Sequence, residues 1–356
     1  MAAKTVKNLN SKIYYQGQYW NDLPQVQNYI AKSITGDENK WWVEYFKQKY
    51  ATTPFHHGLF LNCGDGRWER EFIDRKIVKT ATAFDVSPDF IKKALLLRGK
   101  RKIEYILADA NKVKLPKNKY DLIVNYAALH HTQYINRLCN VLANSLTQDG
   151  IFLNFDYVGP SRNQYPIVNW LILKLVNNTL PKNLKKTTLG YPHLPTMLAT
   201  DPTEAIHSNL IVDSVSRFFN ITEKRNTGGG IAYEILTHNT NLNKKIISLK
   251  KSKKHIQRLL KLDRIFTTLK IVPVYFSFFI ASKKSQRDVK TAYFQQIENI
   301  REKYSLKLEN TYTLFNFLVM FKHYRSWRKR AKMTGDYMIY TLARVASLFL
   351  AFLKHI

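Results

Sequence analysis

A glycine-rich turn after a short apolar run is the chemically most informative feature of the sequence. Residues 59–72 read LFLNCGDGRWEREF, an apolar segment followed by a tight turn and a helical pattern. Gly64 and Gly66 lack a Cβ, so a nucleoside or amino-acid group can lie directly against the backbone. A strand that ends in such a turn before a helix also directs backbone N–H groups at a ligand. Alone this pattern is weak evidence, because glycine-rich strand ends are common in α/β proteins.

Two carboxylates that follow the next apolar segments make the pattern more specific. Asp85 ends the second segment about 20 residues after the turn, which is the spacing of a carboxylate that binds ribose hydroxyls. Asp109 follows the third segment, and with the backbone N–H of Ala110 it can hold the edge of an adenine ring. These residues lie at successive predicted strand ends, where open α/β sheets bind their ligands.

Two adjacent histidines follow the fourth apolar segment. Residues 120–125 read YDLIVN and are followed by YAALHH, which ends in His130 and His131. A neutral imidazole titrates near neutral pH, so either ring can take a proton from a hydroxyl as that hydroxyl becomes a nucleophile. The alternative is a structural pair in which one ring is buried and the other is solvated.

The elements that must position these residues alternate between strand and helix patterns. This alternation predicts an α/β fold with a doubly wound, mostly parallel, seven-stranded sheet. Residues 160–200 interrupt it, and we expect them to form a cap over the carboxyl edge of the sheet. The predicted strands are 59–62, 80–85, 103–107, 120–125, 151–158, 219–224 and 272–281. The predicted helices include 24–33, 41–50, 67–75, 88–97, 135–146, 167–179, 203–216 and 245–265.

In the order and spacing of these motifs the chain resembles the class I S-adenosylmethionine (SAM)-dependent methyltransferases. The resemblance rests on Cys63–Gly66, Asp85, Asp109 and Asp121–His131. It implies a Rossmann-like fold, SAM as the cofactor, and in-line methyl transfer to an oxygen or nitrogen of an acceptor. The cofactor-binding residues it implies are Asn62, Cys63, Gly64, Asp65, Gly66, Asp85, Val86, Asp109, Ala110 and Asn125.

A narrower resemblance points to the acceptor. The stretches FDYVGPSRNQYP (155–166), DPTEAIHS (201–208) and NTGGG (226–230) look like a bacterial group of these enzymes associated with surface-polysaccharide (O-antigen, capsule) biosynthesis. This implies a small-molecule or glycan acceptor. From their place after the fourth strand, His130 and His131 are the expected catalytic residues, with one ring facing the acceptor as a general base or a positioning group. In a helix over 203–216, residues three apart share one face. The acceptor-binding residues expected are Asp156, Tyr157, Ser161, Arg162, Glu204 and His207, for which an ordinary strand end, turn and helix start are the plain alternatives.

The chain departs from the family pattern at three positions. Phe60 stands where many members have an acidic residue near the methionine amino group, Asn62 where glycine is usual, and Asp149 where a second turn glycine is usual. Asparagine tolerates a positive φ better than most residues. An NAD site is the main alternative, but the turn lacks a third glycine at the position of Glu69. Cys63 and Cys139 show no metal-ligand spacing, so no metal is expected.

The charge of the chain is strongly positive and uneven. The net charge is +30, with residues 1–243 contributing +11 and residues 244–356 contributing +19. Such a field implies an anionic partner. We expect a loosely packed leader over 1–40, a methyltransferase domain over 41–283 that includes the cap, and a basic helical extension over 284–356.

The extension suggests a surface for attachment. Residues 322–332 read KHYRSWRKRAK, and residues 337–353 are nearly uncharged apart from Arg344. That run is shorter than the roughly 20 residues that span a bilayer, so an interfacial helix beside a polybasic patch (322–353) is predicted on an anionic membrane. A solvated charge run and RNA binding are the alternatives.

The sequence also bears on the location of the protein and on two alternative activities. The N-terminus has no apolar signal region and cysteines are few, so we expect a cytoplasmic protein at the inner membrane surface. An RNA methyltransferase is disfavoured, because NYAA stands where an NPPY-type tetrapeptide would position an amine. A non-catalytic protein that kept the fold is the third possibility.

Overall fold

The centre of the molecule is one twisted sheet of seven strands. The computed structural model describes residues 19–187, 189–192, 194, 197–198, 201–242, 246, 249–284 and 294–302. The strand order is β3-β2-β1-β4-β5-β7-β6, and β7 runs antiparallel to both of its neighbours. The predicted doubly wound, mostly parallel sheet is thereby confirmed. The strands are β1 (Phe55–Phe60), β2 (Val78–Asp85), β3 (Ile103–Leu107), β4 (Tyr120–Tyr126), β5 (Leu146–Tyr157), β6 (Phe219–Asn226) and β7 (Phe276–Lys283).

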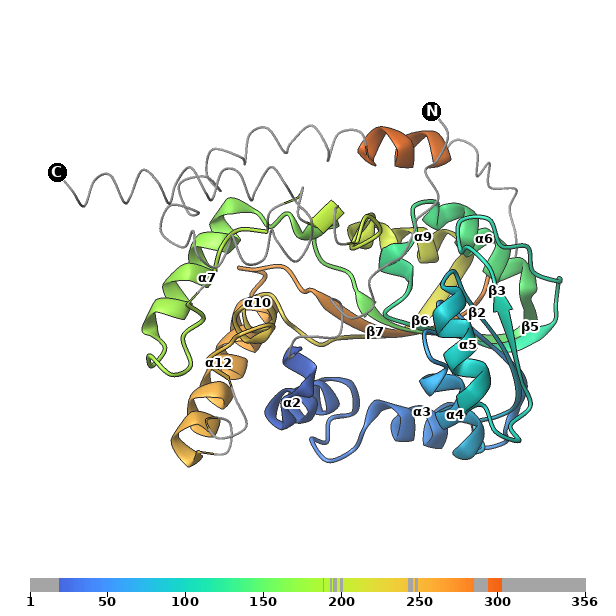
Figure 1. Cartoon of the computed structure of the whole chain (residues 1–356), viewed down its shortest axis with the longest axis horizontal. Coiled ribbons are helices and arrows are strands. Elements are labelled where there is room, and N and C mark those ends of the chain that lie inside the picture. The colour runs from blue at the N-terminus through green and yellow to red at the C-terminus, as the bar shows by residue number, and fades with distance from the viewer. Residues whose placement is uncertain are drawn as a thin grey trace.

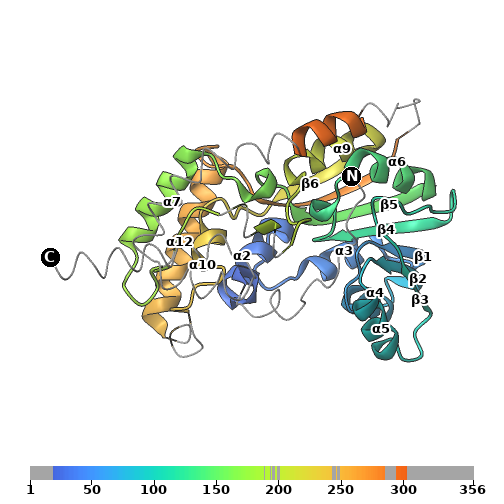
Figure 2. The same cartoon turned by 45° about the horizontal axis from the view of Figure 1, so that its top comes forward.

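Helices cover both faces of the sheet (Figures 1 and 2). The helices α3, α4 and α5 lie on one face, and α6 and α9 lie on the other. Ser87 caps α5 as predicted, because its side chain accepts the N–H of Phe90. The helices are α2 (Pro24–Thr35), α3 (Trp42–Tyr50), α4 (Arg67–Asp74), α5 (Pro88–Leu97), α6 (Ile135–Ser145), α7 (Ile167–Thr179), α9 (Ile211–Phe218), α10 (Ala232–Leu236) and α12 (Lys250–Thr268).

Several predicted elements have other bounds in the structure: the strand predicted over 59–62 is β1 at Phe55–Phe60, and the helix predicted over 245–265 is α12 at Lys250–Thr268. The helix predicted over 203–216 begins only at Ile211, because Ala205 has a φ of 49° and residues 201–207 form turns. Glu204 and His207 therefore do not share a helical face. The strand predicted from residue 272 begins at Phe276, after Pro273, which cannot donate to a strand ladder.

The N-terminal segment is part of the core, so the expectation of a loosely packed leader is wrong for residues 19–40. The inner face of α2 buries Val26, Ile30 and Ile34, each at most 2% exposed. Trp20 stacks on Phe276 of β7 with ring centroids 5.1 Å apart. The segment is amphipathic with helical spacing, and this pattern is what carries it into the core.

Beyond the end of β7, α7, α10 and α12 form a helical side of the molecule (Figures 1 and 2). Asp263 of α12 is fully buried and accepts the N–H groups of Gly229, Ile231 and Ala232 at 2.7–2.9 Å. It also accepts the hydroxyl of Tyr29 from α2 at 2.8 Å. The NTGGG stretch thus serves to join three parts of the fold.

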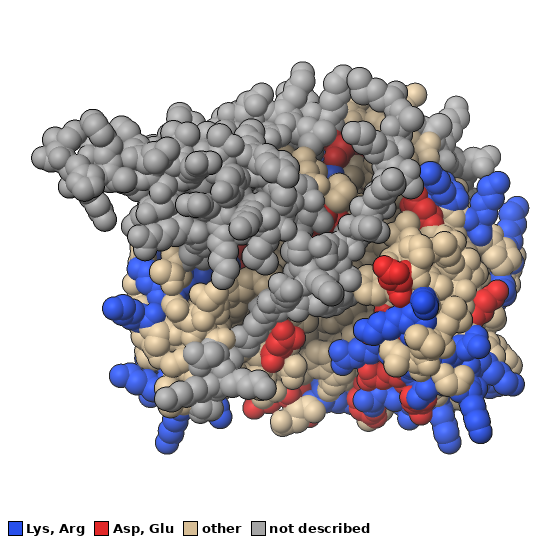
Figure 3. Space-filling view, viewed as in Figure 1, with Lys and Arg blue, Asp and Glu red and all other residues tan. Residues whose placement is uncertain are grey.

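The predicted attachment segments, 322–332 and 337–353, lie outside the described residues. Within the described ranges, no helix has the length and apolar character needed to cross a membrane. Figure 3 shows basic side chains along the lower and right-hand parts of the described surface rather than in one continuous patch on this face.

Candidate active site

The glycine turn between β1 and α4 has the backbone shape that close approach of a ligand requires. Asn62, Gly64 and Gly66 have positive φ angles of 42°, 55° and 78°. Asparagine tolerates this region better than most residues, which explains why Asn62 can stand where glycine is usual. A Cβ built on Gly64 would meet no atom within 4 Å. The Gly64 N–H donates to Asp85 Oδ2 at 2.9 Å, which ties the turn to the end of β2.

Asp85 and its apolar neighbours suit a nucleoside. Asp85 Oδ1 accepts the N–H of Ser87 at 2.8 Å. Burial raises the pKa of Asp85, and the backbone hydrogen bonds oppose that rise. Val86 follows Asp85 in the chain and is 54% exposed. Leu107 of β3 pairs in register with Asp85 and is 56% exposed. A carboxylate beside exposed apolar side chains can bind a ribose while a base packs against them.

The remaining predicted cofactor residues of the first three loops lie at the same edge. Asp109 Oδ1 accepts the N–H of Asn111 at 2.8 Å, and Ala110 is buried beside it. Asp65 pairs with Lys93 at 2.9 Å. Their contacts with a cofactor stay predictions. We call this group the cofactor edge: Asn62, Cys63, Gly64, Asp65, Gly66, Asp85, Val86, Asp109 and Ala110.

A buried network lies under the two histidines, where β4 and β5 end. Asp156 is 1% exposed, and its Oδ1 accepts from His130 Nδ1 at 2.6 Å and from the Tyr157 N–H at 2.7 Å. Its Oδ2 accepts from Asn125 Nδ2 at 2.8 Å and from the Leu129 N–H at 2.9 Å. These bonds place Asn125 and Asp156 as positioning residues beneath His130, where direct ligand contact was expected.

His130, His131 and Glu204 form what we call the histidine cluster. Glu204 Oε2 lies 3.8 Å from His130 Nε2 and 4.0 Å from His131 Nε2. Burial opposes charge on His130, but the charge and hydrogen bond of Asp156 prevail and raise its pKa to about 9. Burial and the nearby charge of His130 lower the pKa of His131. At neutral pH His130 is therefore charged and His131 is neutral.

The neutral ring of His131 has a defined tautomer. The Thr203 hydroxyl donates to Asp201 Oδ1 at 2.6 Å. Thr203 Oγ1 must therefore accept the proton of His131 Nδ1, which lies 3.0 Å away. The other ring nitrogen, Nε2, lies on the side of Glu204, 4.0 Å from its Oε2.

The same cluster is where the described residues could hold a metal ion. Ligand atoms of His130, His131 and Glu204 lie within 4.8 Å of one another, an arrangement that the sequence did not predict. A divalent cation bound to His130 Nε2 would displace the proton on that nitrogen, while Nδ1 would keep its hydrogen bond to Asp156. The raised pKa of His130 among the carboxylates Asp156, Asp201 and Glu204 favours a proton on that ring.

Arg162 holds the segment that carries Glu204. It is 1% exposed, and its Nη1 donates to the carbonyls of Pro202 at 2.6 Å and Glu204 at 3.3 Å. Its Nη2 pairs with Glu302. Arg162 is thus a buried positioning residue, whereas the sequence predicted a side chain facing the substrate.

The other predicted acceptor residues surround the cluster at different depths. His207 is 1% exposed, and burial, followed by the charge of Arg162, lowers its pKa to about 4. Tyr157 is buried, and its hydroxyl donates to the Pro160 carbonyl at 3.2 Å. Ser161 lies near the surface and donates to Asn209 at 2.5 Å. Of these three, Ser161 is the residue most open to a ligand.

A helix over residues 294–302 completes this side of the molecule. Glu298 is fully buried and accepts from the backbone N–H and the side-chain Nδ2 of Asn136, at 3.1 Å and 2.7 Å. Arg217 lies over the Phe294 ring at 4.5 Å from its centroid. Figure 1 shows this helix in orange, packed above α6 and α9. The extension predicted over 284–356 thus includes one described helix, 294–302, which packs against α6 and α9.

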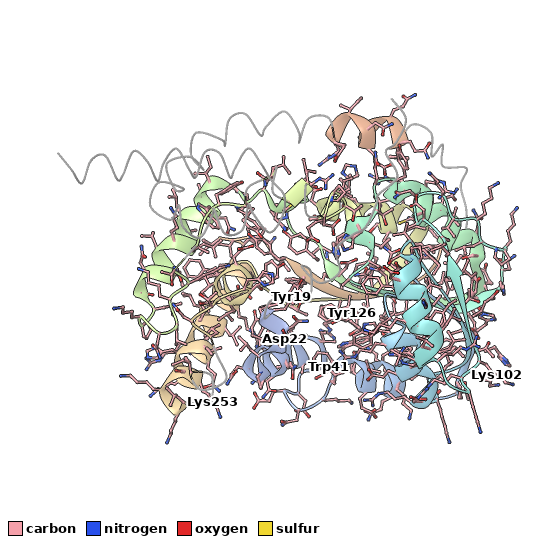
Figure 4. The ribbon with its side chains drawn as sticks, in the orientation of Figure 1. Tyr19, Asp22, Trp41, Lys102, Tyr126 and Lys253 are labelled. Carbon is pink, nitrogen blue, oxygen red and sulfur yellow. The ribbon has the colours of Figure 1, made fainter. Side chains whose placement is uncertain are left out.

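Three aromatic side chains, Trp42, Trp68 and Tyr126, pack together between the cofactor edge and the N-terminal segment. Tyr126 lies against Trp68, with ring centroids 4.1 Å apart, and stacks on Trp42 at 5.9 Å. Asp22 of the N-terminal segment is close enough for its charge to act on Tyr126 (Figure 4). Burial raises the pKa of Tyr126 to about 12, so its hydroxyl stays protonated. These three aromatic side chains make the surroundings of the carboxyl end of β4 apolar.

Three contributors to the site were missed at the sequence level. Asp201 and Thr203 set the tautomer of His131, although they lie some 70 residues further along the chain. The third is Glu69 in the first turn of α4, which is 1% exposed. A signal for Glu69 existed, because it lies three residues before the buried Phe72 and so shares its inward helical face.

Part of the chain is similar to known proteins. Residues 59–154 match the family described as a methyltransferase domain. An uncharacterized methyltransferase of Mycobacterium tuberculosis is 25% identical over 136 residues, covering 38% of this chain and 68% of that protein. An S-adenosylmethionine dependent methyltransferase structure from Mesorhizobium loti covers 68% of this chain and 97% of its own, with 17% identity and a TM-score of 0.41. Phosphoethanolamine N-methyltransferase 2 of Haemonchus contortus, solved with S-adenosylhomocysteine, covers 80% of this chain and 61% of its own, with 14% identity and a TM-score of 0.46.

The fold and the family match lead to one conclusion. The sheet order, with a single antiparallel strand between β5 and β6, frames a glycine turn after β1 and a carboxylate after β2. Residues 59–154 therefore match a methyltransferase domain set in a Rossmann-like sheet, and the cofactor that this match implies is S-adenosylmethionine.

Proposed function

We propose that this methyltransferase acts on a hydroxyl oxygen of a small-molecule or glycan acceptor bound at the histidine cluster. The observation that carries the proposal is the position of His131, whose Nδ1 lies 3.0 Å from Thr203 Oγ1 and whose Nε2 lies 4.0 Å from Glu204 Oε2. The lowered pKa of this ring supports the proposal, because it favours a neutral imidazole. A hydroxyl loses its proton as it becomes a nucleophile, and a nearby neutral imidazole suits that transfer. Transfer to a nitrogen that is already nucleophilic would need no such base.

The residues present fit the cofactor. The open space over Gly64, the carboxylate of Asp85 and the exposed side chain of Val86 match its amino-acid, ribose and adenine parts in order. When bound, SAM supplies an electrophilic methyl group. His131 would take the proton of the acceptor hydroxyl, and Glu204 would stabilise the resulting imidazolium. His130, held by Asp156, keeps the cluster oriented and balances its negative charge.

The class of acceptor is a proposal supported by the narrower sequence resemblance. The stretches around Asp156 and Glu204 look like those of enzymes associated with surface polysaccharides, whose acceptors are rich in hydroxyl groups. The basic, partly apolar segment 322–353 supports a place at an anionic membrane surface. The charge of +30 keeps RNA as the competing acceptor.

The test is to measure S-adenosylhomocysteine formed from SAM with two acceptor panels. One panel holds sugar nucleotides and oligosaccharides, and the other holds structured RNAs. We expect turnover on the first panel, and its loss in His131→Ala but not in His56→Ala, since His56 is an exposed residue of β1 outside the site. Turnover on RNA alone, or turnover that is equal in both variants, would contradict the proposal.

A further inference from the structure

The carboxylates around the glycine turn differ in whether they already have partners. Asp65 pairs with Lys93 at 2.9 Å and is partly exposed. Asp85 accepts two backbone N–H groups, from Gly64 and Ser87. Glu69 is different, because its Oε2 is buried and has no hydrogen-bond partner in the part of the chain that the structure describes.

An unpartnered buried carboxylate is unfavourable unless something else occupies its surroundings. Glu69 is 1% exposed in the first turn of α4, directly after the turn that receives the cofactor. Burial raises its pKa to about 8. Buried charges in proteins are normally paired or neutralised, so a position like this one points to a missing positive group.

Other features place Glu69 beside the turn. After burial, the charge of Glu69 is the largest influence that raises the pKa values of the Cys63 thiol and the Tyr105 hydroxyl. Tyr105 in turn lies against Gly66, where an added Cβ would come within 2.1 Å of its hydroxyl. Glu69, Cys63 and Tyr105 therefore gather around the same few backbone atoms.

We propose that Glu69 binds the α-ammonium group of the methionine part of SAM. The ammonium would supply the positive group that Glu69 lacks, and the open space over Gly64 would receive the rest of the amino acid. The last residue of β1 cannot bind the ammonium group, because it is Phe60, whose ring packs edge to face on Phe72 with ring centroids 5.4 Å apart. Phe72 lies one turn after Glu69 on α4. The carboxylate of Glu69 therefore lies on the face of α4 that packs against Phe60 of β1.

The proposal rests on the SAM site and not on the identity of the acceptor. The test compares S-adenosylhomocysteine with its desamino analogue, in which hydrogen replaces the α-ammonium, by isothermal titration calorimetry. We expect the wild-type protein to bind the desamino compound at least tenfold more weakly. Glu69→Gln should weaken the binding of S-adenosylhomocysteine about tenfold and leave the affinity for the desamino compound unchanged. The ratio of the two dissociation constants should therefore fall towards one.

A matched control lies on the same helix. Glu71 is paired with Arg75 at 2.9 Å on a more exposed face, so Glu71→Gln should keep the wild-type ratio. Glu69→Met serves as a second variant, because an apolar side chain of similar size replaces an unpaired buried carboxylate without loss of folding. It should show the same collapsed ratio.

Proton release gives a second readout. The charged or titratable groups that face Glu69 are Cys63, Asp65, Arg70, Asp85 and Tyr105. Because Glu69 is largely protonated at pH 7 in the empty site, binding an ammonium should release close to one proton. Titrations in buffers of different ionisation enthalpy should show this release for S-adenosylhomocysteine with the wild-type protein. The desamino compound and Glu69→Gln should not show it.

The outcomes separate this inference from the assignment of the cofactor. A wild-type protein that does not bind S-adenosylhomocysteine would contradict the SAM site itself. If the wild-type protein binds S-adenosylhomocysteine and the Glu69 variants keep the wild-type ratio of the two dissociation constants, only the role of Glu69 would be overturned.

Discussion

The cofactor edge and the histidine cluster lie at the same end of the sheet but are assembled in different ways. The cofactor edge comes from three loops within residues 62–110, each directly after one strand. The histidine cluster joins residues 130–131 to residue 204, and it depends on Arg162, which pairs with Glu302. Cofactor affinity should therefore depend on local sequence, whereas turnover should depend on distant parts of the chain.

The largest expected effect comes from removing the helix over 294–302. A chain that ends at residue 293 leaves Arg162 as a buried charge without Glu302 and leaves Asn136 without Glu298. We expect a loss of about 3 kcal/mol or more in unfolding free energy, measured by urea denaturation. A chain that ends at residue 302 is the control, because it keeps both Glu298 and Glu302, and it should be more stable than the shorter chain. Equal stability of both chains would show that the helix is not part of the domain.

The next effect separates the two regions by kinetics. His131→Ala should lower kcat by about 100-fold or more, because a positioned general base contributes at least that factor. The affinity for S-adenosylhomocysteine should not change, since the ring lies outside the cofactor edge. A variant with normal kcat would reduce the pair to a structural role.

The pH dependence of turnover follows from the two rings. His131, with a lowered pKa, should lose activity only in acid, whereas His130 should lose its proton as the pH rises through about 9. The stability that charged His130 provides is complete below about pH 6.5 and is lost as the pH rises through about 9. Asp156→Asn should move the alkaline limb of the rate profile to lower pH by about one unit or more. An unmoved limb would show that another group sets it.

The smallest effect is expected at the rim. Ser161→Ala removes a hydroxyl that bonds to Asn209 near the surface. We expect a rise in the acceptor KM of about twofold to fivefold, which corresponds to roughly 0.5–1 kcal/mol. The S-adenosylhomocysteine affinity should be unchanged. A large effect on cofactor affinity would place Ser161 in the wrong region.

The fold and the cofactor edge could be predicted because their signals are local. The apolar run before Asn62, the two glycines and the carboxylate of Asp85 each lie within one strand and its following loop. Their types report directly on backbone shape and hydrogen bonding. The same locality explains why the bounds of α5 and α7 were predicted to the residue.

The histidine cluster could be predicted only in part. His130 and His131 were found from their place after β4, but their protonation depends on Asp156 and on Asp201, which no local pattern connects to them. Glu204 was named for a helical face that does not exist, because the backbone turns at Ala205. Arg162 was assigned to the acceptor from its place after the fifth strand and from the family resemblance, whereas a tertiary pair with Glu302 buries it.

Titration of S-adenosylhomocysteine into the wild-type protein, Asp85→Ala and His131→Ala, followed by calorimetry, tests the central claim most directly. We expect wild-type affinity for His131→Ala and a loss of about 1–3 kcal/mol for Asp85→Ala, as for a lost hydrogen bond to a charged group. Equal affinity of all three proteins, or a loss confined to His131→Ala, would contradict the division between the cofactor edge and the histidine cluster.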